Sequence, residues 1–292
     1  MNVALEVLRV VVPVFAVAGA GYGYAARGRL DLRSLTDPLF LVFTPALAFT
    51  LMVESRLEGA LLARLTAAAS AVILGSGALT WAVGRLTGAR PRGLYLVTMF
   101  ANNGNLGLPL CALAFGETGL AMATIYCVTG ILFHFSLGIA LVTPRADRWG
   151  VLKLPVLHAI ILGLLLGRLE VAVPAPILKG IELLGAPTIP VMLFALGYRL
   201  RGSRLHAVRM ALVGCAIRIG GGLALAVAAT HVFGLTGLAA KVVILQGAMP
   251  PAAFNFVLAE MYDADPEMVA SAVALGTFAS IVTIPGVLAW IL

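Results

Sequence analysis

Two interrupted apolar stretches carry the residues best suited to bind a small polar molecule. The first is Ala-Asn-Asn-Gly-Asn-Leu-Gly-Leu-Pro at residues 101–109, where Asn102, Asn103 and Asn105 supply amides and Gly107 and Pro109 disturb a helix. Amides both donate and accept hydrogen bonds, whereas proline lacks a backbone donor and glycine loosens the chain. Within a bilayer, such freed backbone groups are tolerated only where they face protein or a water-filled cavity. This stretch therefore predicts a broken helix beside a polar cavity.

A matching interruption lies in the second half of the chain. It runs from Gln246 through the prolines Pro250 and Pro251 to Asn255. Gly/Pro-interrupted apolar segments at corresponding places in two halves indicate a binding site near the bilayer midplane of a secondary transporter. The alternative is a pair of proline kinks whose amides only hydrogen-bond between helices.

The composition indicates a protein that is embedded in a membrane. Hydrophobic residues make up 61% of the 292, and charged residues only 11%, whereas a soluble domain carries roughly 25% charge. At about 20 apolar residues per crossing, the apolar runs predict ten transmembrane helices: 3–25, 35–53, 60–84, 93–115, 118–142, 154–169, 176–198, 205–232, 236–261 and 268–291. The basic residues lie in separate clusters between these runs, so we expect no nucleic-acid partner.

The basic clusters also predict an orientation in the membrane. Lys and Arg are concentrated at residues 27–33, 85–92, 145–153 and 199–204, in the loops that follow the first, third, fifth and seventh runs. Because cytoplasmic loops carry an excess of Lys and Arg, we expect these loops in the cytoplasm and both termini outside it, with the chain in the plasma (inner) membrane.

Three prolines of the first half recur in the same order about half a chain length later. They pair Pro13 with Pro155, Pro45 with Pro190 and Pro109 with Pro251. Five crossings are an odd number, so a second copy enters the membrane from the opposite side. The fold predicted is all-α, with two inverted five-helix repeats at residues 1–146 and 147–292, and broken helices 4 and 9 that cross.

The charges inside the runs favour an anionic substrate. No Asp or Glu lies deep in any run, and the N-termini of broken helices attract negative charge. Arg218 and His134 do lie deep. Arg218 either acts on an anion or bonds to backbone carbonyls, and His134 either carries a proton or links two helices. Glycines such as Gly19 and Gly23 predict close helix packing.

Signals of catalysis are absent from the sequence. There is no HExxH, GxSxG, P-loop or DDxxD motif, so we expect neither an enzyme nor a cofactor nor a metal site.

In these motifs the sequence resembles the auxin efflux carrier family, the plant PIN-formed carriers and their bacterial relatives. The resemblance runs nearly end to end and is most specific at residues 102–110, 189–197 and 249–285. It implies broken helices that cross between a scaffold domain and a transport domain. It also implies that Asn102 meets a substrate carboxylate and that Pro109 and Pro250 are crossover prolines. Asn255 stands where plant members usually have proline, which argues against a plant-like specificity for auxin.

Together these features predict a secondary transporter for a small organic anion, either an auxin-like carboxylate or a dicarboxylate, that works by an elevator or rocking movement of one domain against the other. Asn102, Asn103 and Gln246 are expected to bind the substrate, with Asn105 and Asn255 nearby. An anion channel of the same fold, or a membrane-embedded enzyme or sensor, is the alternative. The lipid bilayer and a second copy of the chain, as a homodimer, are the other expected partners.

Overall fold

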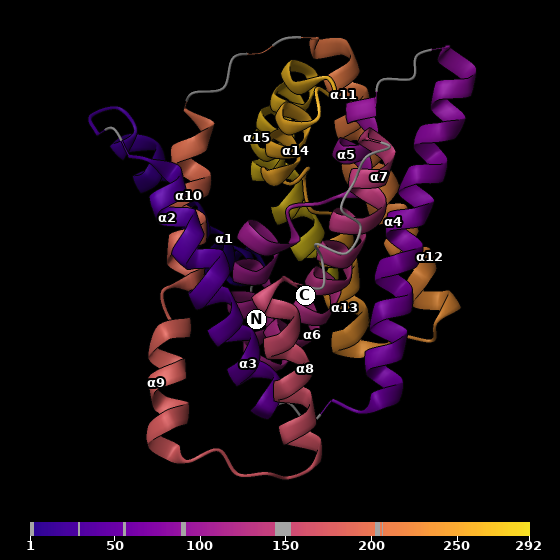
Figure 1. Ribbon diagram of the computed structural model, residues 1–292. Coiled ribbons are helices and arrows are strands. Elements are labelled where there is room, and N and C mark those ends of the chain that lie inside the picture. The colour runs from indigo at the N-terminus through magenta and orange to yellow at the C-terminus, as the bar shows by residue number, and fades with distance from the viewer. Residues whose placement is uncertain are drawn as a thin grey trace.

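The computed structural model is helical along the apolar runs (Figure 1). It describes residues 3–28, 30–54, 57–88, 92–143, 153–201, 205 and 207–292. The helices are α1 Val3–Tyr24, α2 Leu32–Pro38, α3 Thr44–Glu54, α4 Gly59–Thr87, α5 Arg92–Met99, α6 Leu108–Phe133, α7 Ile139–Val142, α8 Pro155–Arg168, α9 Ala175–Gly185, α10 Thr188–Leu200, α11 Val208–Ala216, α12 Gly222–Val232, α13 Gly237–Gly247, α14 Phe254–Met261 and α15 Pro266–Ile291. Wider π-helical turns join some of them: η1 Leu39–Phe43, η2 Asn103–Gly107, η3 His134–Gly138 and η5 Ile217–Gly221.

Six continuous helical segments in the described residues are long and apolar enough to cross a bilayer. They are Ala4–Tyr24, Gly59–Thr87, Asn103–Val142, Ala175–Leu200, Val208–Val232 and Pro266–Ile291. The protein is therefore an integral, multi-pass membrane protein. Shorter apolar helices occupy Leu39–Glu54, Pro155–Arg168 and Gly237–Gly247. The total of ten crossings stays a prediction, because these pieces are shorter than a full crossing.

The longest segment, Asn103–Val142, folds back on itself at Gly116. This glycine has φ 66° and ψ −161°, far from helical values. A Cβ built on Gly130 lies 3.8 Å from the Asn103 side-chain oxygen, and one built on Gly104 lies 3.7 Å from the Cys127 sulfur. Residues before and after Gly116 thus pair in reverse order, so the two arms run antiparallel. They correspond to the separate runs at 93–115 and 118–142.

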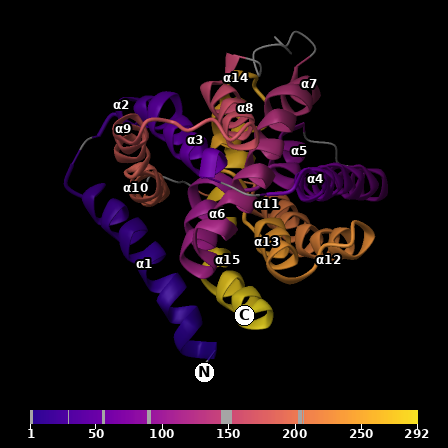
Figure 2. The same ribbon diagram turned by 90° about the horizontal axis from the view of Figure 1, so that it is seen from below.

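The helices form two groups, each with members from both halves of the chain. The outer group comprises α1, α2, α3, α8, α9 and α10, in which α1 packs on α10 and α3 packs on α8 and α9. The crossing group comprises α4 to α7 and α11 to α15. Figure 2 shows α2, α9 and α10 on one side and α4, α12 and α13 on the other. Corresponding helices of residues 1–146 and 147–292 lie in the same group, as an inverted repeat requires; the repeat itself stays a prediction.

Glycines allow the helices of the outer group to approach closely. A Cβ on Gly21 of α1 would overlap the carbonyl oxygen of Phe194 in α10, and a Cβ on Gly197 would overlap that of Ala18. The expected packing at Gly19 and Gly23 is wrong for the described residues, since nothing among them lies within 4 Å of a Cβ at either position. The close contact is thus on the opposite side of α1, at Gly21.

Gly21→Ala should therefore destabilise the protein, whereas Gly19→Ala should not. Overpacking a close contact costs about 1–3 kcal/mol, which corresponds to a melting temperature lower by roughly 2–10 °C. Thermal unfolding of both variants in detergent measures the difference. Equal melting temperatures would contradict the close α1–α10 contact.

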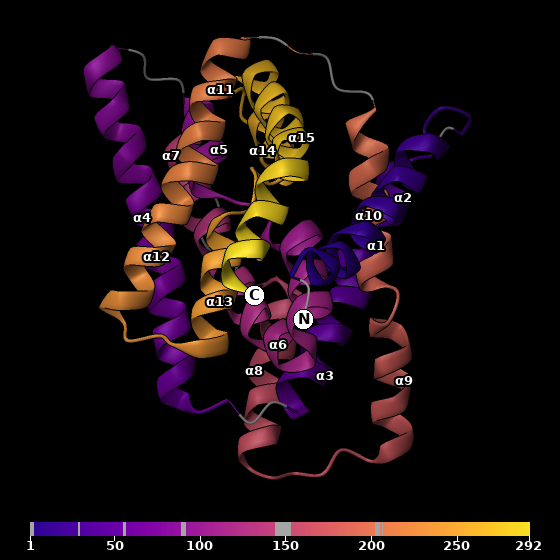
Figure 3. The ribbon, with the colours of Figure 1, turned by 180° about the vertical axis from the view of Figure 1, so that it is seen from behind.

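The described helix ends alternate between two faces of the molecule (Figures 1 and 3). α4 and α10 end, and α5 and α11 begin, on the upper face, whereas α3, α8 and α12 end on the lower one. Arg85, Arg92, Arg199 and Arg201 belong to the upper ends. The placement of this face in the cytoplasm stays a prediction from charge. The expected cluster at 145–153 lies almost wholly outside the described residues.

Candidate functional site

The two interrupted stretches meet where their helices are broken. The backbone N–H of Asn102 donates to the Pro250 carbonyl at 2.7 Å, and that of Ala252 donates to the Phe100 carbonyl at 2.9 Å, as in a short antiparallel bridge between Ala101 and Pro251. α5 and α13 end at this bridge, and the η2–α6 helix and α14 begin beyond it. The interruptions thus bring four half-helix ends to one place inside the crossing group.

Three of the predicted amides hold this crossing together. The Asn103 amide nitrogen donates to the backbone oxygen of Gln246 at 2.9 Å and to its side-chain oxygen at 2.6 Å. The Gln246 amide nitrogen in turn donates to the Cys111 sulfur at 3.6 Å. Gly107 leaves room for the Gln246 side chain, because a Cβ on Gly107 would overlap the Gln246 side-chain oxygen. Asn255 donates to the Phe100 carbonyl at 2.9 Å.

The prolines of the crossing lie where the helices are irregular. Pro109 is the second residue of α6 and directly follows the π-helical turn η2, so a carbonyl one turn earlier receives no N–H from this position. Pro250 and Pro251 lie between α13 and α14, where their carbonyl-bearing backbone forms the bridge.

Arg218 is 1% exposed and bonds to backbone carbonyls at the crossing. Its Nη1 donates to the carbonyls of Thr98 at 2.8 Å and Met99 at 3.3 Å, and its Nη2 donates to that of Gly247 at 2.7 Å. Of the two interpretations of Arg218 that the sequence left open, the structure shows the one in which the guanidinium bonds to backbone carbonyls.

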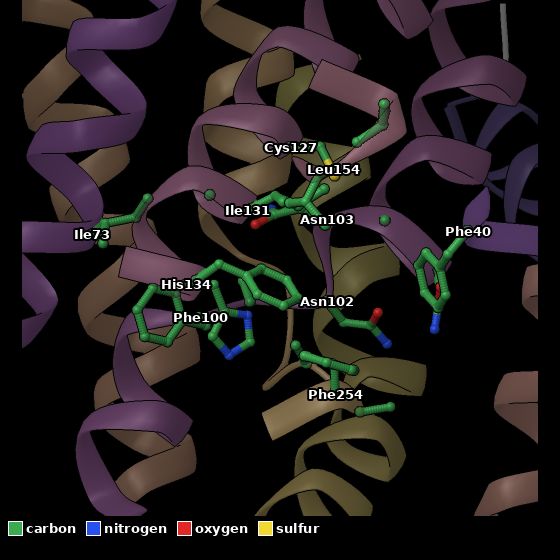
Figure 4. Close-up of a pocket in the computed structure, with 18 of the residues that line it drawn as sticks. Phe40, Ile73, Phe100, Asn102, Asn103, Cys127, Ile131, His134, Leu154 and Phe254 are labelled. Atoms are coloured by element: carbon green, nitrogen blue, oxygen red, sulfur yellow. The ribbon is translucent and has the colours of Figure 1, made fainter. Parts of the chain in front are cut away.

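A cavity of about 280 Å³ lies beside the crossing (Figure 4). Asn102, Asn103 and Asn105 are its amides, whereas Gln246 and Asn255 do not line it. Nor do Arg218 or the predicted crossover residues Gly107, Pro109, Pro250 and Pro251. The outer group contributes to the wall through Phe40 of η1 and Pro155 and Val156 of α8, so the cavity lies between the two helix groups.

Aromatic rings form one wall of the cavity. His134 stacks on Phe100 with ring centroids 4.1 Å apart and meets Phe254 edge-on at 5.7 Å. The ring centroids of Phe135 and Phe254 are 5.4 Å apart. The deep histidine therefore belongs to an apolar wall, and its Nε2 has no hydrogen-bond partner among the described residues. Sequence reasoning missed the phenylalanines, although Phe100 directly precedes the first interruption and Phe254 lies within the second.

The polar wall of the cavity is rich in donors and carries no formal charge. The amide nitrogen of Asn102 is buried without a partner among the described residues. The N–H groups of Gly104 and Asn105 lie in the first turn of the η2–α6 helix, which leaves them without intrahelical acceptors. The lining contains no Asp, Glu, Lys or Arg. Such a wall can bind an anion through oriented donors, while the rings bind an apolar body.

Asn103 offers a hydrogen-bond acceptor to the same cavity. Because its nitrogen donates to the Gln246 carbonyl, which can only accept, the side-chain oxygen of Asn103 is the atom left over. This oxygen lies on the Gly130 side of the cavity and can accept a hydrogen bond.

Comparisons with known proteins point to membrane transport. The family described as "Membrane transport protein" matches residues 145–288. The chain is 31% identical over 214 residues to an uncharacterized transporter of Methanocaldococcus jannaschii, covering 68% of each chain. It is 28% identical over 270 residues to an uncharacterized transporter of Methanothermobacter thermautotrophicus, covering 88% of each.

Proposed function

The chain belongs to the membrane transport protein family, that of the auxin efflux carriers, and from this premise we propose that it is a secondary transporter for a small organic anion. The observation that carries the proposal is the donor-lined cavity at the helix crossing, between the two helix groups. Secondary transporters bind their substrates near the bilayer midplane, between broken helices, and a cavity beside the crossing of two broken helices supports such a site here.

The preference for an anion rests on the donors of the polar wall. A carboxylate in the cavity can accept from the buried Asn102 amide nitrogen and from the first N–H groups of the η2–α6 helix, whose positive dipole end adds to the attraction. A metal ion or organic cation would find no carboxylate among the residues that line the cavity.

The remaining lining favours an acid with an apolar body and a donor of its own. The rings of Phe100, His134 and Phe254 can pack on an aromatic or aliphatic body. The Asn103 side-chain oxygen can accept from a hydroxyl or N–H group of the substrate. A hydroxylated or nitrogen-containing carboxylic acid fits these features better than a simple fatty acid.

Alternating access is supported by the position of the cavity between the outer group and the crossing group. Phe40, Pro155 and Val156 belong to one group, and the amides and most of the rings belong to the other. A shift of the crossing group against the outer group would carry the amides away from these apolar contacts. We place this movement in the plasma (inner) membrane, with both termini outside the cytoplasm.

Uptake into proteoliposomes under an imposed membrane potential tests the proposal. An interior-positive potential of 100 mV is worth about 2.3 kcal/mol per charge, so a monovalent acid should accumulate about 50-fold. A panel of labelled carboxylic acids is compared with the matching methyl esters, in liposomes with and without the protein. Protein-dependent uptake of an acid but not its ester is expected. Protein-dependent uptake of esters or organic cations only would contradict the proposal.

A further inference from the structure

Carbonyl ends of two broken helices converge on one guanidinium group. α5 ends with the carbonyls of Thr98 and Met99, and α13 ends with that of Gly247. Arg218 donates to all three. No described carboxylate forms a salt bridge with it, so its bonding partners are the helix ends themselves.

The charges at this point balance without an added ion. Each helix C-terminus carries roughly half a negative elementary charge, so two of them amount to about one. The guanidinium contributes one positive charge that is present at every physiological pH. In other transporters, carbonyl groups at unwound helices and half-helix C-termini coordinate the coupling sodium ion. Here the lone pairs that would face such an ion accept hydrogen bonds from Arg218.

We propose that Arg218 is a fixed internal cation that takes the place of a coupling sodium ion, so that the protein moves its substrate without sodium. The sodium independence of transport rests on the proposed function. The role of the Arg218 charge at the crossing does not, because it concerns the stability of the fold. Arg218 is a positioning residue in this account, since it holds the broken helices and does not line the cavity.

Gly222 makes this placement of the guanidinium geometrically feasible. A Cβ built on Gly222, one turn after Arg218, would overlap both the Arg218 Nη2 atom and the Gly247 carbonyl oxygen to which it donates. Gly220 belongs to the same run of three glycines, yet nothing among the described residues lies within 4 Å of a Cβ there. Gly222→Ala therefore pushes the guanidinium and the Gly247 carbonyl apart while the charge stays in the chain, and Gly220→Ala is the matched control.

Thermal unfolding of the purified full chain tests the role of the charge. Arg218→Ala removes it, and Arg209→Ala removes an exposed arginine of the same transmembrane segment as a control. Each variant is melted in sodium chloride, in N-methylglucamine chloride at equal ionic strength, and in the latter with millimolar guanidinium. The wild type should melt at the same temperature in all three. Arg218→Ala should melt lower by roughly 5–15 °C, and guanidinium or sodium should restore about 3 °C or more.

Gly222→Ala and Arg218→Lys keep the test decisive if Arg218→Ala does not fold. Gly222→Ala should lose several degrees relative to Gly220→Ala, because the guanidinium and the Gly247 carbonyl are pushed apart. The loss should be smaller in the Arg218→Ala background, where only the overlap with the carbonyl remains. Arg218→Lys should melt between the wild type and Gly222→Ala, because it keeps the charge but not the fork of donors. Gly222→Ala as stable as Gly220→Ala, or Arg218→Ala as stable as Arg209→Ala, would overturn the inference. So would an Arg218→Ala protein that neither cation stabilises.

Replacing sodium by N-methylglucamine in the transport assay completes the experiment. Wild-type uptake of the organic acid should be unchanged. Strict sodium dependence would overturn this inference and leave the proposed function standing. An absence of any transport in both salts, with the predicted melting behaviour, would contradict the proposed function and leave the role of Arg218 intact.

Discussion

Replacing Asn102 by aspartate is expected to weaken binding of the organic anion by about a thousandfold. The two side chains have nearly the same shape, but the aspartate would place a negative charge about 4 Å from the substrate carboxylate. At that separation and an effective dielectric constant near 20, the repulsion is worth about 4 kcal/mol, which is roughly three powers of ten in affinity. Titration of the purified variant with the transported acid measures the loss.

Asn102→Ala gives the neutral reference for this change. It removes hydrogen bonds to a charged group, each worth about 1.5–3 kcal/mol, so affinity should fall about ten- to more than a hundredfold. Asn102→Ala should keep the wild-type melting temperature within a few degrees, since the Asn102 amide nitrogen has no partner in the described residues. Asn102→Asp should melt lower, because it buries an unpaired charge at a position that is 3% exposed. Tighter binding by Asn102→Asp would mean a cationic substrate, and unchanged binding by both would remove Asn102 from the site.

Gln246→Ala should show the opposite pattern, a large loss of stability with little change in affinity. Gln246 is 0% exposed, and its loss deprives Asn103 of a side-chain acceptor and leaves a void beside Cys111. Such losses cost about 2–4 kcal/mol, or roughly 5–15 °C in melting temperature. Substrate affinity should change less than about threefold, because Gln246 does not line the cavity.

A double-mutant cycle with Asn103→Ala separates this structural role from a binding role. The two changes should couple by about 1–2 kcal/mol in stability, because the Asn103 amide nitrogen donates to the Gln246 side-chain oxygen, which Gln246→Ala removes. A loss of affinity in Gln246→Ala without a loss of stability would instead make Gln246 a substrate ligand, as the sequence suggested.

The positions of the helices and of a cavity beside the Asn102 segment followed from the sequence because the bilayer imposes strong rules. A long apolar run must be helical in lipid, and the helices lie on these runs. An interruption such as Asn102 to Pro109 is tolerated only beside a cavity or protein, and the amides Asn102, Asn103 and Asn105 do line a cavity. The pairing with the interruption at Pro250 follows from the same rule.

The direction in which each amide side chain points could not be predicted from the sequence. Gln246 and Asn255 lie in a segment whose composition resembles that of the Asn102 segment. Their side chains nevertheless donate to the Cys111 sulfur and the Phe100 carbonyl, which are far away in the chain. The carbonyls that bind Arg218 come from Thr98, Met99 and Gly247, which no local pattern connects to it.

Wide helical turns also escape sequence reasoning. All four π-helical turns of the described residues lie at the site: η1 carries Phe40, η2 carries Asn103 and η3 carries His134 on the cavity wall, and η5 carries Arg218. A π turn inserts one residue into the helical register and is often found at functional sites. The regular period of an α-helix, about 3.6 residues, assigns these side chains to the wrong faces.

Counterflow in proteoliposomes tests the central claim most directly. Vesicles are loaded with an excess of the unlabelled acid and diluted into a trace of the labelled one, with no potential across the membrane. A carrier with one site that faces either side alternately should accumulate the label transiently above its equilibrium level, and Asn102→Asp vesicles should not. Label that only equilibrates in wild-type vesicles, without an overshoot, would contradict alternating access at this crossing and would favour a channel.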